Sequence, residues 1–189
     1  FYGMQKVDVW FVSHFDEDHM SGLMEILESY PYVGISIDCI AYSGLYQDNH
    51  PVLALARKQG IEVRPMWQGD IIETNGETIR FLLPRKDIPM ESDNDASLCF
   101  LYESKEKDIL FMYILQKYKE KWFEYAVDVY SSKISEDKIS ILKVPHHGSR
   151  NSLSERSYDY FDEAVISCGI NNHFGHPHRE VLDSMIISE

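Results

Sequence analysis

The 189-residue sequence has few cysteines and no long apolar segment. Its three cysteines, Cys39, Cys99 and Cys168, are far apart and lie in apolar runs, which argues against a disulfide framework and predicts buried, reduced thiols. No apolar run approaches the roughly 18 residues that span a bilayer, and no signal-peptide pattern is recognised. We therefore expect a soluble protein, and the reduced thiols favour a cytoplasmic over an extracytoplasmic location.

Basic residues are also scarce. The chain has 18 Lys and Arg against 31 Asp and Glu, a formal net charge of -13. This charge argues against a broad nucleic-acid surface, because phosphate binding normally needs a stripe of Lys and Arg. A small metal-lined site could still act on a phosphodiester, since bound divalent cations would be the largest local charges there.

The apolar pattern predicts one α/β domain that covers residues 1–189. Strands are expected over residues 6–13, 34–44 and 61–67, and helices over 21–30 and 50–60 between them. Further strands are expected over 70–74, 77–84, 97–104, 108–115, 139–145 and 163–169, and helices over 116–133 and 179–189. The first four of these strands indicate an antiparallel meander, and the alternation before them indicates a layered α/β architecture.

Seven of the eight histidines lie in three short clusters, each directly after a predicted strand. The clusters are His14 with His19, His146 with His147, and His173 with His176 and His178. Loops at strand ends are where a layered α/β protein assembles its sites on a rigid sheet. Three such loops converging on one edge would bring imidazole and carboxylate ligands together.

The first cluster, "SHFDEDHMSGL", has the spacing of a metal-binding loop. His14 and Asp16 can point the same way if the backbone is extended, and Asp18 and His19 follow on the next turn. Imidazole nitrogen with carboxylate oxygen suits zinc, manganese or iron(II). The alternative is that the acids only favour the positive N-terminal end of the following helix. That alternative explains neither histidine, so we favour a metal site.

The other two clusters carry less information individually. In "LKVPHHGS", Gly148 and Ser149 allow a tight turn after His146 and His147. Adjacent histidines at a turn are more often exposed or locally hydrogen-bonded than bound to metal. In "NNHFGHPH", Gly175 allows a bend before His176. The combination of three clusters in one chain is what favours a shared site.

These residues resemble the metallo-β-lactamase fold superfamily, and more narrowly the metallo-β-lactamase-like domain of the ComEC family of competence DNA-internalisation proteins. That branch typically has S-H-x-D-x-D-H-x-x-G-L, as "SHFDEDHMSGL" does here. The segments "IEVRPMWQGDIIETNGETIRFLLP", "NDASLCFLYE", "LKVPHHGS" and "GHPH" are also similar, in matching order from about Val7 to Leu182. The combination of these motifs is fairly specific.

The resemblance implies an αββα four-layer sandwich with a metal site at one edge of its sheets. It also implies a metal-dependent hydrolase of the phosphodiesterase or nuclease type, which would serve DNA uptake in competence and act on single-stranded DNA with metal-activated water. We expect one or two divalent ions, zinc first and manganese second. The expected metal ligands are His14, Asp16, Asp18, His19, and His146 or His147, and the expected catalytic residues are Asp18, His176 and His178.

Two departures from the family pattern support a second hypothesis. Where the family has a strand ending in "TGD", whose Asp bridges two metals, this chain has Met112, Tyr113 and Ile114. Asp93 or Asp95 in the preceding loop could substitute. The chain also starts after the family's first strands, which predicts an open sheet edge and a homodimer through it. The alternative function is therefore a catalytically degenerate module with a binding or assembly role.

Overall fold

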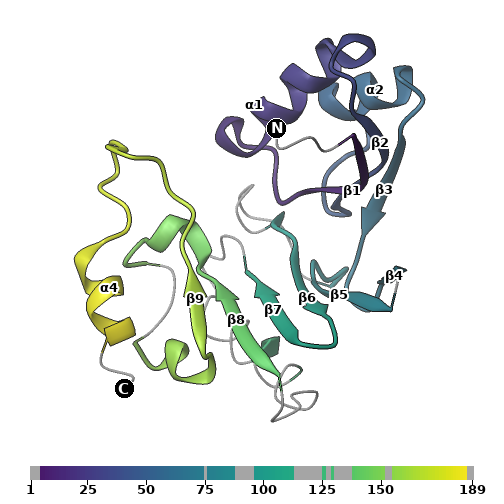
Figure 1. The fold of residues 1–189 in the computed structure, drawn as a ribbon. Coiled ribbons are helices and arrows are strands. Elements are labelled where there is room, and N and C mark those ends of the chain that lie inside the picture. The colour runs from purple at the N-terminus through teal and green to yellow at the C-terminus, as the bar shows by residue number, and fades with distance from the viewer. Residues whose placement is uncertain are drawn as a thin grey trace. The chain divides into compact units, whose positions relative to one another are not determined.

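The structure, a computed structural model, describes residues 5–74, 76–87, 96–112, 125–126, 129, 138–151 and 155–186. The chain divides into two compact units, one of Phe1–Gln68 with Leu83–Leu98 and the other of Gly69–Leu82 with Cys99–Glu189. The strands form two sheets, one of three strands and one of six (Figure 1). The predicted mixed α/β class is confirmed.

The first unit is built as predicted from alternating strands and helices. Its parallel sheet has the order β1-β2-β3, and the helices α1 and α2 connect consecutive strands. The bounds are β1 Lys6–Val12, α1 Glu17–Glu28, β2 Ser36–Ser43, α2 Pro51–Lys58 and β3 Glu62–Met66, with a short 3-10 helix η1 at Tyr30–Tyr32. Parallel neighbours need crossover connections, and the two helices provide them.

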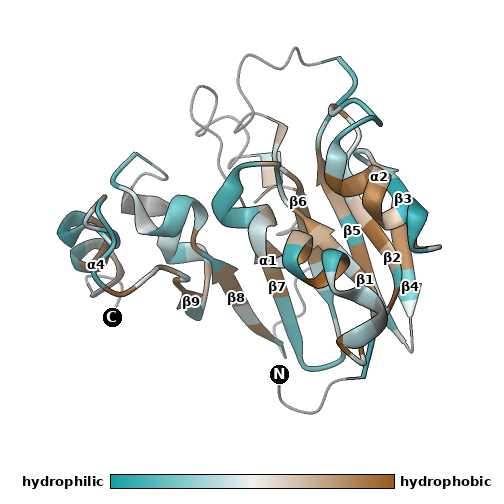
Figure 2. Ribbon diagram, turned by 90° about the horizontal axis from the view of Figure 1, so that it is seen from above, coloured by the Kyte–Doolittle hydropathy of each residue, from teal (hydrophilic) through white to brown (hydrophobic). Residues whose placement is uncertain are grey.

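The core of the first unit lies between its helices and its sheet. Leu23 and Leu27 of α1 and Leu53 of α2 are almost completely buried in one apolar cluster with Ile40 of β2. Hydrophobic colouring accordingly lies along α2 and β2 (Figure 2). Helix spacing places these leucines on inward faces, and their burial stabilises the unit by about 1.5–3 kcal/mol for each side chain.

Helix α1 begins at Glu17, four residues before the predicted start. Asp16 has an extended backbone at the N-cap position, with φ -65° and ψ 148°, so the helix starts directly after it. The acidic and histidine residues that were expected to lie in a loop therefore divide between two elements. His14 and Asp16 lie in the β1–α1 connection, and His19 lies in the first turn of α1.

The second unit holds the sheet with the order β4-β5-β6-β7-β8-β9. Its strands are β4 Ile71–Thr74, β5 Glu77–Leu83, β6 Cys99–Glu103, β7 Lys107–Phe111, β8 Ile139–Lys143 and β9 Glu163–Val165. The β4–β5 and β6–β7 pairs are antiparallel, in agreement with the predicted antiparallel meander. The β7–β8 and β8–β9 pairs are parallel.

The described residues of the second unit also include helical segments. They are the 3-10 helices η3 Pro145–Gly148 and η4 Glu155–Tyr160, and the helix α4 Arg179–Ile186, which confirms the predicted terminal helix. The predicted helix over 116–133 lies mostly outside the described residues, although Tyr125, Ala126 and Val129 are helical. No helix in the described part of the chain is both long and apolar enough to cross a membrane.

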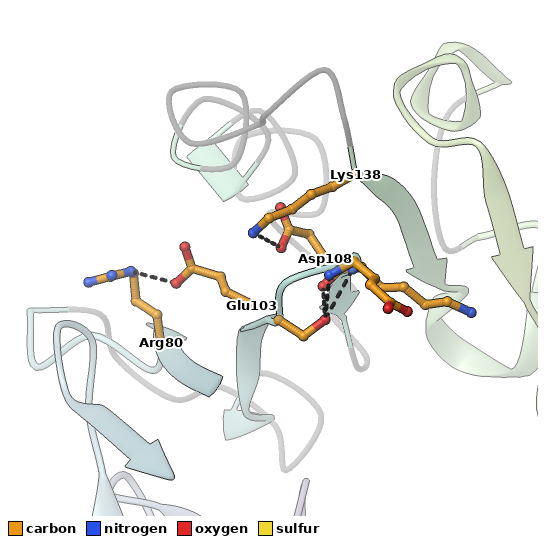
Figure 3. A network of polar contacts seen from close by, with 7 residues as sticks. Arg80, Glu103, Asp108 and Lys138 are labelled. Carbon is orange, nitrogen blue, oxygen red and sulfur yellow. Dashed lines mark hydrogen bonds and ion pairs between the residues drawn. The ribbon is translucent and has the colours of Figure 1, made fainter. Parts of the chain in front are cut away.

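Aromatic packing and ion pairs hold the second sheet together. The Phe100 ring lies 4.7 Å from the Phe111 ring across the β6–β7 hairpin. Lys138 Nζ lies 3.0 Å from Oδ1 of Asp108, whose side chain is only 3% exposed, and Arg80 faces Glu103 at 3.4 Å (Figure 3). A buried carboxylate needs such a partner, because a lone buried charge is strongly destabilising.

The cysteine prediction is confirmed at two of its three positions. Cys39 and Cys99 are buried as predicted, but Cys168 is exposed. The prediction for Cys168 is wrong because β9 ends at Val165, and the apolar run that follows the strand continues as irregular, largely exposed chain. The predicted homodimer through an open sheet edge stays a prediction.

Candidate metal centre

The loop after β1 places His14 beside Asp16. The His14 side chain is completely buried, and its Nε2 lies 3.3 Å from Oδ2 of Asp16, whose side chain is 44% exposed. The backbone N–H of Phe15, between them, points at the hydroxyl of Tyr46 at 3.4 Å. The two predicted ligands therefore lie side by side, as the extended spacing suggested.

His19 and Asp18 form a second imidazole–carboxylate pair in the first turn of α1. Nε2 of His19 lies 3.4 Å from Oδ2 of Asp18. The rings of His14 and His19 are 4.1 Å apart between centroids. All four predicted residues of the first motif thus form one cluster inside the first unit, with each ring directing Nε2 at a carboxylate.

The opposite nitrogens of both rings meet a residue that the sequence analysis did not single out. Ser13 Oγ lies 3.0 Å from Nδ1 of His14 and 3.1 Å from Nδ1 of His19. Its place as the first residue of the S-H-x-D-x-D-H pattern was the sequence signal for it. Histidine ligands commonly have the ring nitrogen that does not bind metal engaged by such an oxygen.

Helix capping does not account for Asp16. It occupies the N-cap position of α1, yet its side chain makes no capping hydrogen bond, and the carboxylate lies against His14 instead. Glu17 and Asp18 do lie in the first turn, where the helix dipole favours negative charge. The alternative interpretation therefore holds for the position of these two acids but not for Asp16.

The "PHHG" segment has an unusual backbone. His146 and His147 have φ of 49° and 54°, and Gly148 follows with φ 80°. Left-handed conformations cost non-glycine residues about 1–2 kcal/mol each. Such outliers cluster at binding and catalytic sites. The tight turn expected from Gly148 is present, and it places both histidines at its bend.

Two hydrogen bonds fix which ring nitrogen carries a proton in the second unit. Nδ1 of His147 lies 2.7 Å from the carbonyl oxygen of Ser167, which can only accept, so this Nδ1 carries the hydrogen and, in the neutral ring, Nε2 carries the lone pair. The backbone N–H of Arg150 donates to Nδ1 of His178 at 3.1 Å. The neutral His178 ring therefore carries its hydrogen on Nε2 and can donate it.

His176 lies between the other histidines of this unit. Its ring centroid is 4.8 Å from that of His178, 5.6 Å from that of His146 and 6.3 Å from that of His147. Burial, with smaller effects from His178 and His147, lowers the pKa of His176, so the ring is neutral at pH 7. His173, the remaining member of the third cluster, is exposed.

The backbone ties these two loops to each other. The N–H of His178 donates to the carbonyl of Gly148 at 2.9 Å, and Asn172 both accepts from the N–H and donates to the carbonyl of His176. The "HHGS" and "GHPH" segments, which are distant in sequence, therefore form one histidine cluster in the second unit. Asn172, Arg150 and Ser167 carry no sequence signal for this supporting role.

The donor atoms of both clusters are of the kinds that bind divalent cations. The first offers two imidazole nitrogens and two carboxylate oxygens, and the second offers Nε2 of His147. Mixed nitrogen and oxygen ligands of this kind bind zinc and manganese. The residues at the expected bridging position, Tyr113 and Ile114, and the two substitute candidates, Asp93 and Asp95, lie outside the described residues.

Comparison with known proteins gives two similar curated sequences. The chain is 29% identical over 182 residues to ComE operon protein 3 of Bacillus subtilis, which covers 95% of the chain and 22% of that protein. It is 26% identical over 177 residues to Recombination protein 2 of Haemophilus influenzae, which covers 92% of the chain and 19% of that protein. The chain thus spans about a fifth of the length of these relatives. No protein-family model matches it.

Among solved structures, the metallo-β-lactamase fold protein YhfI of Bacillus subtilis is similar to 85% of this chain, over 74% of its own length, with 12% identity and a TM-score of 0.45. The similarity over nearly the whole chain to ComE operon protein 3 and Recombination protein 2 confirms the resemblance inferred from the motifs.

Proposed function

We propose that this chain is a metal-dependent hydrolase that cleaves a phosphodiester, most simply in single-stranded DNA. The observation that carries the proposal is the pairing of each imidazole Nε2 with a carboxylate oxygen, His14 with Asp16 and His19 with Asp18. A buried histidine beside an exposed carboxylate is poorly explained by packing alone, because apolar packing does not require an imidazole nitrogen to face a carboxylate oxygen.

In this proposal the first cluster holds the cation and the second supplies the remaining groups. His14, Asp16, Asp18 and His19 would be ligands, and His147 would add its Nε2 lone pair. A bound zinc or manganese ion would lower the pKa of a coordinated water and offset the charge that develops on the phosphate. The family resemblance supports the joint use of the two clusters.

The chain's own groups can then orient the reactants. Asp18, whose side chain is 68% exposed, can accept a hydrogen bond from the attacking water. His178 has its hydrogen on Nε2, because Arg150 donates to Nδ1, and can donate it to a phosphate or leaving oxygen. His176, neutral at pH 7, can support the same oxygen. The net charge of -13 predicts weak binding to nucleic acid outside this site.

The experiment combines metal analysis of protein purified without chelators with a nuclease assay on single-stranded DNA in added zinc or manganese. We expect stoichiometric metal, and turnover that His14→Ala abolishes. His173→Ala, a histidine replaced at an exposed position of the second unit, is the matched control and should keep both properties.

The competing outcome is specific. Protein that binds no metal and has no turnover would refute the hydrolase and favour the degenerate module, for which the isoleucine at position 114 is the supporting observation. Metal retained by His14→Ala at wild-type affinity would refute the assignment of the first cluster as the ligand set.

A further inference from the structure

Ser13 is held in place directly after β1. Only 4% of the residue is exposed, and its carbonyl accepts the N–H of Leu98 at 3.0 Å. The hydroxyl oxygen lies 3.0 Å and 3.1 Å from Nδ1 of His14 and His19. One buried oxygen therefore serves two imidazoles that each direct the other nitrogen at a carboxylate.

The number of hydrogens that Ser13, His14 and His19 can share limits which tautomers the two rings can adopt. A serine hydroxyl has one hydrogen to donate and two lone pairs to accept with, and a neutral imidazole carries one N–H. Since Ser13 can donate to only one ring, the other ring must carry its hydrogen on Nδ1. A ring with its hydrogen on Nδ1 keeps the lone pair on Nε2, whereas the neighbouring carboxylate, which can only accept, favours the hydrogen on Nε2.

We propose that Ser13 is a positioning residue that holds at least one of His14 and His19 in the Nδ1–H tautomer and so prepares the Nε2 atom of that ring to bind a cation. The inference deepens the proposed function, because it concerns the same site. It assigns to Ser13 the orientation of two ligands from a single atom. An alanine at this position would leave both rings free to place the hydrogen on Nε2, where it blocks the ligand lone pair.

The test compares Ser13→Ala with Ser13→Thr, which keeps a hydroxyl. Ser43→Ala is the matched control: Ser43 is a fully buried serine of the same unit, and its hydroxyl has no hydrogen-bond partner among the described residues. Thermal melts establish that each variant folds. Nitrogen-15 NMR of the histidine rings, about two pH units above the usual histidine pKa of about 6.5, reads the tautomers directly.

In metal-free wild-type protein we expect at least one of His14 and His19 to be the Nδ1–H tautomer. In Ser13→Ala we expect both rings to carry the hydrogen on Nε2, where each can donate to its carboxylate. Zinc affinity, measured by competition with a chromophoric chelator, should fall about tenfold or more in Ser13→Ala, the range known for supporting residues of metal ligands. Ser13→Thr should restore both readouts, and Ser43→Ala should change neither.

Two results would overturn the inference. One is an Nε2–H tautomer for both rings in the wild-type protein, and the other is an unchanged tautomer in a folded Ser13→Ala variant. Neither result depends on metal binding, so the inference can fail while the wild-type protein still binds zinc. Conversely, wild-type protein that shows the expected tautomer but binds no zinc would refute the proposed function and leave the positioning role of Ser13 intact.

Discussion

The packing of the two histidine loops in the second unit predicts the effect of one added methyl group. Gly148 has φ 80°, and a Cβ placed there would lie 2.7 Å from Cβ and 3.2 Å from Cα of Pro177. Gly175 has a similar φ of 70°, but a Cβ there would meet no atom within 4 Å. Replacing either glycine by alanine would therefore strain the backbone to a similar degree, but only the alanine at position 148 would clash with Pro177.

The magnitudes follow from these two terms. Gly175→Ala should lower the free energy of unfolding by about 1–2 kcal/mol, the cost of a left-handed non-glycine residue. Gly148→Ala should cost the same amount plus about 1–3 kcal/mol for overpacking against Pro177, whose backbone would have to move. We expect the difference between the two variants to lie in that second range.

Urea denaturation of both variants measures the difference, provided that the dependence of the free energy on urea is unchanged. In Gly148→Ala, movement of the loop should also lengthen and weaken the hydrogen bond from the N–H of His178 to the carbonyl of residue 148. A change in the NMR chemical shift of the His178 amide would report this. Equal destabilisation by Gly148→Ala and Gly175→Ala would refute the contact between the loops.

Two further predictions concern single side chains of the second unit. His147→Asn should lower zinc affinity at least about tenfold, because it removes the ring whose Nδ1 is held by the Ser167 carbonyl and whose Nε2 is the proposed ligand. His146→Asn should keep the zinc affinity, and asparagine tolerates the left-handed backbone at both positions. Equal losses of affinity in a chelator competition would contradict this. Burial lowers the pKa of Lys143 to about 8 from its usual 10.5. Below pH 8 the buried amine is charged, so Lys143→Met should raise the unfolding midpoint most there, and the gain should shrink as the pH rises toward 10.5; a gain independent of pH would contradict this.

The fold was predictable from the sequence where one physical signal dominated. In the first unit, the alternation in "KVDVWFVS" predicts a strand, and the helical spacing of Leu23 and Leu27 predicts the helix that follows. The two can be told apart because apolar residues recur at every second position in a half-buried strand and at every third or fourth position in a helix. The start of α1 was not predictable to the residue. Asp16 can cap a helix or bind a cation through the same oxygens, and the choice depends on where His14 points.

The sequence predicted which residues form the candidate site but not which ring nitrogen of each histidine carries the hydrogen. Spacing alone placed imidazoles and carboxylates together, since neighbours in sequence stay neighbours in space. The partners of the other ring nitrogens come from residues with no special signal, such as the carbonyl of Ser167 and the N–H of Arg150, which are 20 and 28 residues from the rings they bind. Tertiary packing decides these contacts.

The strained histidines of the second unit bear on whether its cluster is functional. At φ 49° and 54°, His146 and His147 hold a conformation that glycine or asparagine would adopt at lower cost. Two such residues in succession cost about 2–4 kcal/mol together. The carbonyl of Ser167 holds one ring in place, and the bond between Gly148 and His178 holds the turn. If these two positions served only to form the turn, glycine at both would make the turn more stable than histidine does. The imidazoles are therefore better explained by what their nitrogens bind than by the backbone they occupy.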